Sequence, residues 1–495
     1  MSSKSNRSGT NAFVLTLSKV ITLLLSVLVS MILARTLSLS EYGTYSELLT
    51  VSSIGVSLFS LGLPNALNYF LPRCKDEIGK RKFIGFYFAS ITVLALALMG
   101  AMALLNKTIA GYYNNERLIV YSYFLIIIPW TKLLISSRSN LLVAEGKVMR
   151  EIICCIANGI LLALIAVFTM FDRSSFDIYI VLYVLIESVF AVLVYFDAYI
   201  LSGRKIDISV HWGQIKELLE YTIPLGLSTA VSTISLDLDK LIIGFVMDEA
   251  SVAIYANAGK ELPFSLISTS FTAVFLPQIV AFIRDKRTKA AIVRWKDIME
   301  INYIILSFCT AASIVFAPQI ISLLYSEAYI SGVTIFRIYS LTLLLRITYW
   351  AMILNAFGKT KEILCNSVIC LTLNAALNVL FYKVFGFAGP AYATLVSIFA
   401  IVVLQILRTA KLLKTPVSSF IPFRQFILPS VVCLISGIFV AILAKKLNVG
   451  IDTKGIILAV IIGAVWAVLY MALYSRKIVI LWKKLNHEII DGEIE

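Results

Sequence analysis

The chain has 495 residues, of which 59% are hydrophobic and only 15% are charged, and its mean hydropathy is +0.90. Soluble domains average about 45–50% apolar and about 25% charged residues. This composition excludes a soluble globular protein and indicates a polytopic membrane protein. The formal net charge of +14 reflects membrane topology rather than binding to nucleic acid, because cytoplasmic loops of membrane proteins collect Lys and Arg.

Apolar runs follow one another along the whole chain. A helix needs about 20 apolar residues to cross a bilayer, and we predict an all-α protein with 14 transmembrane helices. The first six spans cover residues 12–34, 45–71, 83–105, 118–142, 152–171 and 178–201. The next six cover 219–246, 253–283, 298–325, 334–357, 363–385 and 389–410, and two more cover 425–444 and 454–474.

Charged residues in the loops predict the orientation of these spans. If the N-terminus is inside, most of the 43 Lys and Arg residues fall in cytoplasmic segments and few fall in outer loops. Positive charge collects on the cytoplasmic side of membrane proteins. We therefore expect both termini in the cytoplasm.

An internal repeat relates two sets of six spans. Tyr45 follows the first turn of the first set, and Tyr255 follows the first turn of the second. The fourth span ends at Leu141–Lys147 (LLVAEGK) and the tenth ends at Ile353–Lys359 (ILNAFGK). The distance in sequence between these two stretches is nearly the same as that between the two tyrosines. Landmarks at nearly one offset indicate a duplication of six spans.

A duplicated set with an even number of spans keeps its orientation in the membrane. The repeat is therefore parallel, with an axis along the membrane normal, as in several transporter folds. It predicts a six-helix bundle in residues 1–201, a second in 202–410, and two further helices with a cytoplasmic tail in 411–495. We expect the functional site between the two bundles.

Charged side chains occur inside the seventh and eighth spans. By count along the helices, Lys240 and Lys260 lie at the same depth, ~10 Å below the outer surface at ~1.5 Å per residue. Asp239, Lys240, Lys260 and Glu261 could thus form one cluster. Two interpretations stay open, namely salt bridges that lock two helices and a basic site that faces a wet cavity. Asp237, Asp239 and Glu261 are also candidates for coupling to an ion, since charge at membrane depth indicates function.

Other basic residues inside spans are candidates for the same site. Lys19 in the first span corresponds to Thr229 in the repeat, so it faces either a cavity or a carboxylate, or else extends to the inner interface. Arg337 and Arg346 share the tenth span, nine residues apart, and therefore point about 180° apart on a helix of 3.6 residues per turn. Arg346 is the deeper of the two and is the preferred candidate.

Charges in the fourth and sixth spans are better explained as structural pairs. Lys132 and Arg138 lie on the fourth span, and Glu187 and Asp197 lie on the sixth. Arg138 and Asp197 are about equally far from the starts of their helices. We expect these four residues to pair within the first bundle.

The sequence lacks the usual motifs of catalysis and metal binding. Gly358-Lys359-Thr360 has no upstream glycine at the spacing of a phosphate-binding loop, so the chain is not expected to hydrolyse ATP. The seven cysteines form no CxxC and the two histidines no HExxH. Asp237-Leu238-Asp239 matches the short D-x-D pattern of glycosyltransferases but lies inside a predicted span. We expect no catalytic residues, metal or cofactor.

Several stretches resemble one family of membrane proteins, the Wzx-type polysaccharide and O-antigen flippases of the MATE-like MOP superfamily. These stretches cover nearly the whole chain in the expected order. They are Ala34–Tyr45 (ARTLSLSEYGTY), Leu238–Gly244 (LDKLIIG), Tyr255–Pro263 (YANAGKELP), Asn374–Asn378 (NAALN) and Phe385–Thr394 (FGFAGPAYAT).

The resemblance implies two six-helix bundles around a central cavity in the bacterial cytoplasmic membrane. It implies translocation of an undecaprenyl-pyrophosphate-linked oligosaccharide (an O-antigen, capsule or exopolysaccharide unit) to the outer leaflet, coupled to a proton or sodium gradient. Glycan polymerase and chain-length machinery are the partners expected beside the membrane lipids. Lys240 and Lys260 match charged positions of the family, and Lys19 does so more loosely. The family often has more basic residues in the first two spans, whereas Glu47 is the only charge in this second span.

Two other functions remain open from the sequence. A drug/ion antiporter of the same fold would favour carboxylates in the cavity, whereas the basic candidates here outnumber Asp239 and Glu261. A membrane enzyme that polymerises or transfers glycans would need an acid or base at the outer surface. Asp248 and Glu249 are the only such residues near the charged cluster.

Overall fold

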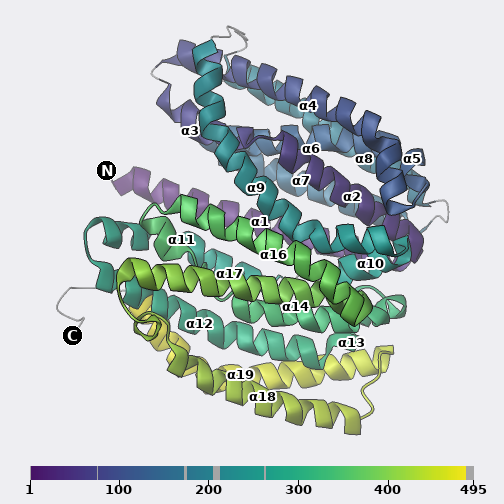
Figure 1. The fold of residues 1–495 in the computed structure, drawn as a ribbon, viewed down its shortest axis with the longest axis vertical. Coiled ribbons are helices and arrows are strands. Elements are labelled where there is room, and N and C mark those ends of the chain that lie inside the picture. The colour runs from purple at the N-terminus through teal and green to yellow at the C-terminus, as the bar shows by residue number, and fades with distance from the viewer. Residues whose placement is uncertain (1, 75, 172–174, 204–211, 261–262, 487–495) are drawn as a thin grey trace. The chain divides into compact units, whose positions relative to one another are not determined.

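The computed structural model describes residues 2–74, 76–171, 175–203, 212–260 and 263–486. Within these residues every regular element is a helix. The chain divides into two compact units, Met1–Ala256 and Asn257–Glu495. Each unit is a bundle of helices whose apolar side chains form its own core (Figure 1).

The first unit is built on three long helices that pack in sequence, α4 on α6 and α6 on α8, with α1 on α7 and α2 on α9. Its core lies between α3, α4, α6 and α8, where the buried Tyr87 hydroxyl donates a hydrogen bond to Ser137 Oγ at 2.8 Å. The helices are α1 (Ser2–Thr36), α2 (Leu39–Phe59), α3 (Leu63–Phe70), α4 (Glu77–Tyr113), α5 (Arg117–Val120), α6 (Ser122–Ala144), α7 (Val148–Phe168), α8 (Ser175–Leu201), α9 (Trp212–Val246) and α10 (Glu249–Ala258).

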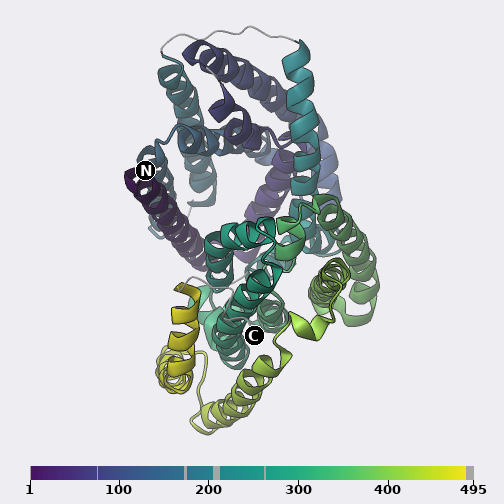
Figure 2. The same cartoon turned by 90° about the vertical axis from the view of Figure 1, so that its left-hand side faces the viewer.

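The second unit is organised around α12, which packs on α11, α14, α18 and α19. Trp295 of α12 is fully buried and stacks on Phe420 with the ring centroids 5.9 Å apart. The yellow α18 and α19 lie along one edge of this unit in both views (Figures 1 and 2). The helices are α11 (Ser265–Arg284), α12 (Thr288–Val315), α13 (Ala317–Leu324), α14 (Val333–Leu345), α15 (Met352–Ala356), α16 (Thr360–Phe385), α17 (Gly389–Leu413), α18 (Phe423–Lys446) and α19 (Thr453–Asn486).

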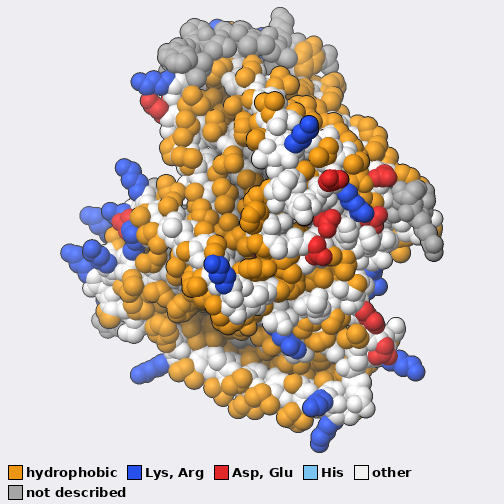
Figure 3. Space-filling view, turned by 45° about the vertical axis from the view of Figure 1, so that its right-hand side comes forward, with side chains coloured by type: hydrophobic (Ala, Val, Ile, Leu, Met, Phe, Trp, Pro, Cys, Tyr) orange, Lys and Arg blue, Asp and Glu red, His pale blue; other side chains and the backbone are white. Residues whose placement is uncertain are grey.

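The apolar helices make this a multi-pass membrane protein. Among the described residues, ten helical segments are long and apolar enough to cross a membrane, or eleven if the bent pair Leu39–Phe59 and Leu63–Arg73 is one span. One segment, Lys361–Leu413, runs over both α16 and α17. The helices α6 and α9 fall outside this set because interior charges and hydroxyl groups lower their apolar content. The count of 14 transmembrane helices stays a prediction. Hydrophobic side chains cover most of the face shown in Figure 3.

Helix ends repeat at the offset found in the sequence. Helix α1 ends at Thr36 and α9 ends at Val246. These two ends are separated by the same number of residues as Tyr45 and Tyr255. The turns after α6 and α15 are alike, because Gly146 has φ 69° and its counterpart Gly358 has φ 71°. Glycine adopts this left-handed conformation without the cost that a Cβ brings.

The unit boundary and the predicted domains follow different criteria. The boundary after Ala256 reflects packing, since α9 lies against α2, α3 and α4 of the first unit. The predicted domains 1–201, 202–410 and 411–495 follow the sequence repeat and stay predictions. Predicted spans 45–71, 253–283 and 334–357 are each interrupted between two helices, whereas continuous spans were predicted.

Candidate functional site

Lys240 of α9 is paired within its own helix. Its Nζ lies 2.5 Å from Asp237 Oδ1, one turn earlier on the same face. The lysine side chain keeps 30% of its surface exposed and the aspartate side chain 12%. Lys240 and Asp237, separate candidates in the sequence, therefore form one ion pair.

Asp239, also on α9, is 2% exposed. Tyr255 of α10 donates its hydroxyl hydrogen to Asp239 Oδ2 at 3.2 Å. Lys260 belongs to the second unit, and Glu261 lies outside the described residues. The cluster of Asp239, Lys240, Lys260 and Glu261 thus stays a prediction.

Glu47 is a buried carboxylic side chain that was not among the predicted site residues. It lies on α2 and is 1% exposed. Asn115, in the turn after α4, donates one hydrogen bond from Nδ2 to Glu47 Oε2 at 2.8 Å and another to Thr44 Oγ1 at 3.0 Å. The signal for Glu47 was its charge inside a predicted span, since such residues mark functional sites.

Lys19 and Arg337 differ in their surroundings. Lys19 is exposed on α1 and forms no ion pair with any residue that the structure describes. Arg337, on α14, donates from Nε to the carbonyl oxygen of Ile314 on α12 at 3.2 Å. Lys19 remains a candidate, and Arg337 serves to contact a neighbouring helix.

The tenth predicted span is interrupted at Arg346. Helix α14 ends at Leu345, and α15 begins only at Met352. The carbonyl oxygen of Leu345 accepts a hydrogen bond from Trp350 Nε1 at 2.6 Å. Irregular backbone at membrane depth is tolerated where protein buries it or where it lines a water-filled cavity.

Side chains of α12 support the same interruption. Asn302 Nδ2 donates to the carbonyl oxygen of Ile347 at 2.7 Å, and Trp295 Nε1 donates to Thr348 Oγ1 at 2.9 Å. Asn302 and Trp295 are fully buried. These bonds supply partners for the Ile347 carbonyl oxygen and the Thr348 hydroxyl at the point where the helix stops.

Lys260 lies at a second interruption, between α10 and α11. Its backbone amide donates to the carbonyl oxygen of Asn257 at 3.3 Å. Helix α11, which follows this interruption, packs on α15, which follows the interruption at Arg346. Two basic residues of the second unit therefore lie on irregular backbone, and the helices that follow them, α11 and α15, pack together.

The four charges of the fourth and sixth predicted spans form two pairs between α6 and α8. Lys132 Nζ lies 2.8 Å from Glu187 Oε1, and Arg138 Nε lies 2.7 Å from Asp197 Oδ2. Arg150 of α7 also bonds Asp197, a partner that the sequence did not indicate. These charges tie three helices of the first unit together.

Asp248, one of the two residues considered for catalysis, caps the start of α10. Its Oδ1 accepts hydrogen bonds from Ser251 N at 2.9 Å and Ser251 Oγ at 2.5 Å. These bonds lower the pKa of Asp248, because they favour the ionised carboxylate. A carboxylate held in this way is a helix cap rather than a proton donor.

The model of the polysaccharide biosynthesis protein family matches residues 32–334. The chain belongs to this family. The match includes Glu47, the Asp237–Lys240 pair, Asp239 and Lys260, whereas Arg346 follows it. No curated protein matches the chain in sequence.

Solved structures place this family member in a known fold. The lipid II flippase MurJ, in an inward closed conformation, matches 94% of this chain and all of its own chain, with a TM-score of 0.75 and 16% identity. An inward-facing multidrug resistance MATE family transporter of the MOP superfamily covers 80% of this chain and 96% of its own, with a TM-score of 0.61 and 15% identity.

A third structure, a point mutant of the Vibrio cholerae MATE transporter VcmN, covers 83% of this chain and 98% of its own, with a TM-score of 0.55 and 13% identity. At these identities the likeness concerns the fold. The family member therefore has the fold of membrane flippases and transporters.

Proposed function

We propose that the protein moves a polyprenyl-pyrophosphate-linked oligosaccharide from the inner to the outer leaflet of the bacterial cytoplasmic membrane by alternating access. The observation that carries this proposal is the position of Lys260 and Arg346. Each lies on irregular backbone inside a predicted span, and the helices that follow them pack together. Membership of a polysaccharide biosynthesis family and a fold shared with a lipid II flippase support the same substrate class.

The chemistry of such a substrate explains the need for basic residues. A pyrophosphate diester carries two negative charges, and moving a charge out of water is costly unless it is paired. Lys and Arg form short, strong hydrogen bonds with phosphate oxygens. Lys19 and Lys240 would add positive charge to Lys260 and Arg346, while the polyprenyl chain stays in the lipid.

An ion gradient would supply the driving force. Asp237, Asp239 and Glu261 are the carboxylates that the sequence offers for binding a proton or sodium ion. Both termini would lie in the cytoplasm. Glycan polymerase and chain-length machinery would act on the product at the outer leaflet.

The test is transport by purified protein in proteoliposomes that contain a lipid-linked oligosaccharide. Lectin accessibility reports the arrival of saccharide in the opposite leaflet. We expect the double variant Lys260→Ala with Arg346→Ala to lower the initial rate at least tenfold, and Arg346→Lys to retain most of the rate. An unchanged rate in the double variant would exclude these cations as the substrate site.

Arg337→Ala is the matched control. Arg337 is the same residue type nearer the other end of α14, and its bond to Ile314 lies on the exposed side. Its loss should leave the rate within twofold of the wild type. Equal loss in Arg337→Ala and Arg346→Ala would show a general effect of removing charge from this span.

A drug/ion antiporter is the alternative, and the buried Asp239 and Glu47 of the first unit favour it. Carboxylates at membrane depth suit a cationic drug. Efflux of a cationic dye from the same proteoliposomes separates the two functions. Dye efflux without movement of lipid-linked saccharide would favour the antiporter.

A further inference from the structure

Glu47 lies where helices of the two sequence repeats meet inside the first unit. Helix α2, which carries it, packs on α9. In the repeat, α9 and α10 are the counterparts of α1 and α2. Glu47 Oε2 accepts the hydrogen bond from Asn115, whereas Oε1 is buried and has no hydrogen-bond partner.

The described neighbours of Glu47 are polar or acidic. Asn115 donates its hydrogen bond, Glu249 of α10 lies within electrostatic range, and among the described residues no Lys or Arg forms an ion pair with Glu47. Tyr113 of α4, whose buried hydroxyl also has no partner, lies within range of Glu47 and Asp237. Asp237 of α9 is itself paired with Lys240. A buried carboxylate with no positive partner is costly, and such a group binds a proton instead.

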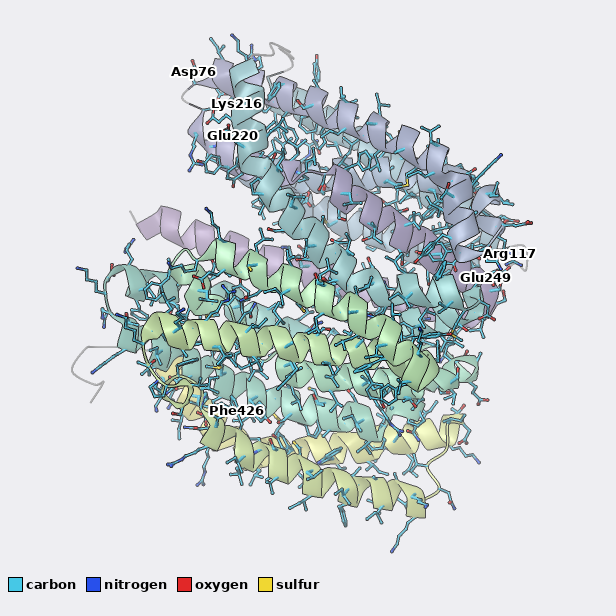
Figure 4. The ribbon with its side chains drawn as sticks, viewed as in Figure 1. Asp76, Arg117, Lys216, Glu220, Glu249 and Phe426 are labelled. Carbon is cyan, nitrogen blue, oxygen red and sulfur yellow. The ribbon has the colours of Figure 1, made fainter. Side chains whose placement is uncertain are left out.

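The helices beside Glu47 pack closely at two glycines. A Cβ on Gly43 of α2 would lie 1.8 Å from the carbonyl oxygen of Glu249. A Cβ on Gly244 of α9 would lie 2.3 Å from the Tyr113 ring. We call this contact of α2 and the end of α4 with α9 and α10 the glycine seam. Arg117 and Glu249, labelled in Figure 4, lie at the same end of this unit.

We infer that Glu47 is a proton-binding site that is occupied when the glycine seam is closed and empties when the seam opens. On opening, water reaches the carboxylic acid, its O–H bond breaks, and the proton passes to water on the predicted outer side. The carboxylate that remains is costly to bury, so the seam closes again only after a proton returns. The assignment of Glu47 as a proton-binding site is argued from its burial and packing, whereas a role of Glu47 in transport rests on the proposed function.

The first experiment measures the seam without any substrate. Hydrogen–deuterium exchange of the full chain in nanodiscs is compared at pH 5.5 and pH 8, after correction for the intrinsic pH dependence of amide exchange. We expect wild-type peptides from residues 39–59 and 237–258 to exchange several-fold faster at pH 8. Glu47→Gln, which is neutral at both pH values, should stay protected at both.

Glu220→Gln is the matched control, because Glu220 is a carboxylate of α9 whose side chain is 67% exposed in its pair with Lys216. It should behave as the wild type. A pH response in Glu47→Gln equal to that of the wild type would overturn the inference. A response to sodium at constant pH, in place of the response to pH, would overturn it as well.

The second experiment measures coupling. Proteoliposomes with an imposed pH gradient should accumulate lipid-linked saccharide in one leaflet with the wild type. With Glu47→Gln this accumulation should be lost, because the seam of that variant stays closed at both pH values. Gradient-driven accumulation by Glu47→Gln would contradict a coupling role. If the wild type moves no lipid-linked saccharide, the proposed function fails, and the exchange experiment still decides whether Glu47 binds the proton.

Discussion

The fourth span of the first repeat and its counterpart in the second repeat end alike and differ inside. Gly146 follows α6 and Gly358 follows α15, both with positive φ. Leu134 is the counterpart of Arg346 in the repeat and lies inside an unbroken α6. At Arg346 the corresponding span stops, and its backbone continues without regular helix to α15.

The two spans therefore place charge in different ways. In α6 the backbone groups bond within the helix, and the charges of Lys132 and Arg138 are matched by carboxylates of α8. At the interruption, Asn302 and Trp295 of α12 bond to the released chain, and Arg346 lies at its start. A duplicated helix can thus become a rigid, charge-paired element in one half and an interrupted, basic one in the other.

The largest effect should come from breaking the charge pair of α6. Asp197 is 1% exposed, and Arg138→Met would leave it with Arg150 alone. Removing one partner of a buried pair costs about 3–5 kcal/mol, so the free energy of unfolding in detergent should fall by that amount. The fall should appear as a lower midpoint of thermal unfolding.

Arg408→Met is the control for that variant. Arg408 pairs with Glu362 in the second unit, and both side chains are about one-third exposed. An exposed pair contributes about 0–1 kcal/mol. Equal losses in Arg138→Met and Arg408→Met would mean that α6 does not depend on its buried pair.

A smaller loss is expected from Asn302→Leu, which removes the hydrogen bond to the carbonyl oxygen of Ile347. Leaving a buried acceptor without a partner costs about 1–3 kcal/mol. The variant should also lower transport, since Arg346 lies on the segment that Asn302 supports. Thermal unfolding and the proteoliposome rate measure the two effects.

Ser136→Ala in the other half tests whether that loss is specific. Ser136 donates its hydroxyl hydrogen to the carbonyl oxygen of Leu133 on the same helix at 2.8 Å. Its removal should change stability by less than about 0.5 kcal/mol, as for most substitutions away from special features. Similar losses at Asn302 and Ser136 would contradict the special role of the interruption.

Features that depend on local pattern could be predicted from the sequence, and features that depend on a distant donor could not. The repeat offset and the positions of Lys132, Arg138, Glu187 and Asp197 follow from spacing along single helices. The pairing of Lys240 with Asp237 could also have been predicted from the sequence. Adjacent residues such as Asp239 and Lys240 do not face each other on a helix, whereas Asp237 lies one turn before Lys240 on the same face.

The interruption at Arg346 lay beyond such reasoning. It depends on Asn302 and Trp295 of another helix, far from Arg346 in the sequence, which bond to the released chain. Glu47 is a similar case, since its burial depends on Asn115, which follows a different helix. A charge inside a span marks both places, but only packing decides whether that charge is paired, protonated or placed on irregular backbone.

Apart from the control variants, the smallest effect is expected at the turns that the two spans share. Gly146→Ala and Gly358→Ala would each force a Cβ into positive φ, and no atom lies within 4 Å of either Cβ position. The cost is then backbone strain alone, about 1 kcal/mol at each site, and it should be the same in both halves. Gly→Asn at either site should cost less, because Asn tolerates the left-handed conformation. Unequal unfolding midpoints for the two Ala variants would show that the turns have diverged as the spans have.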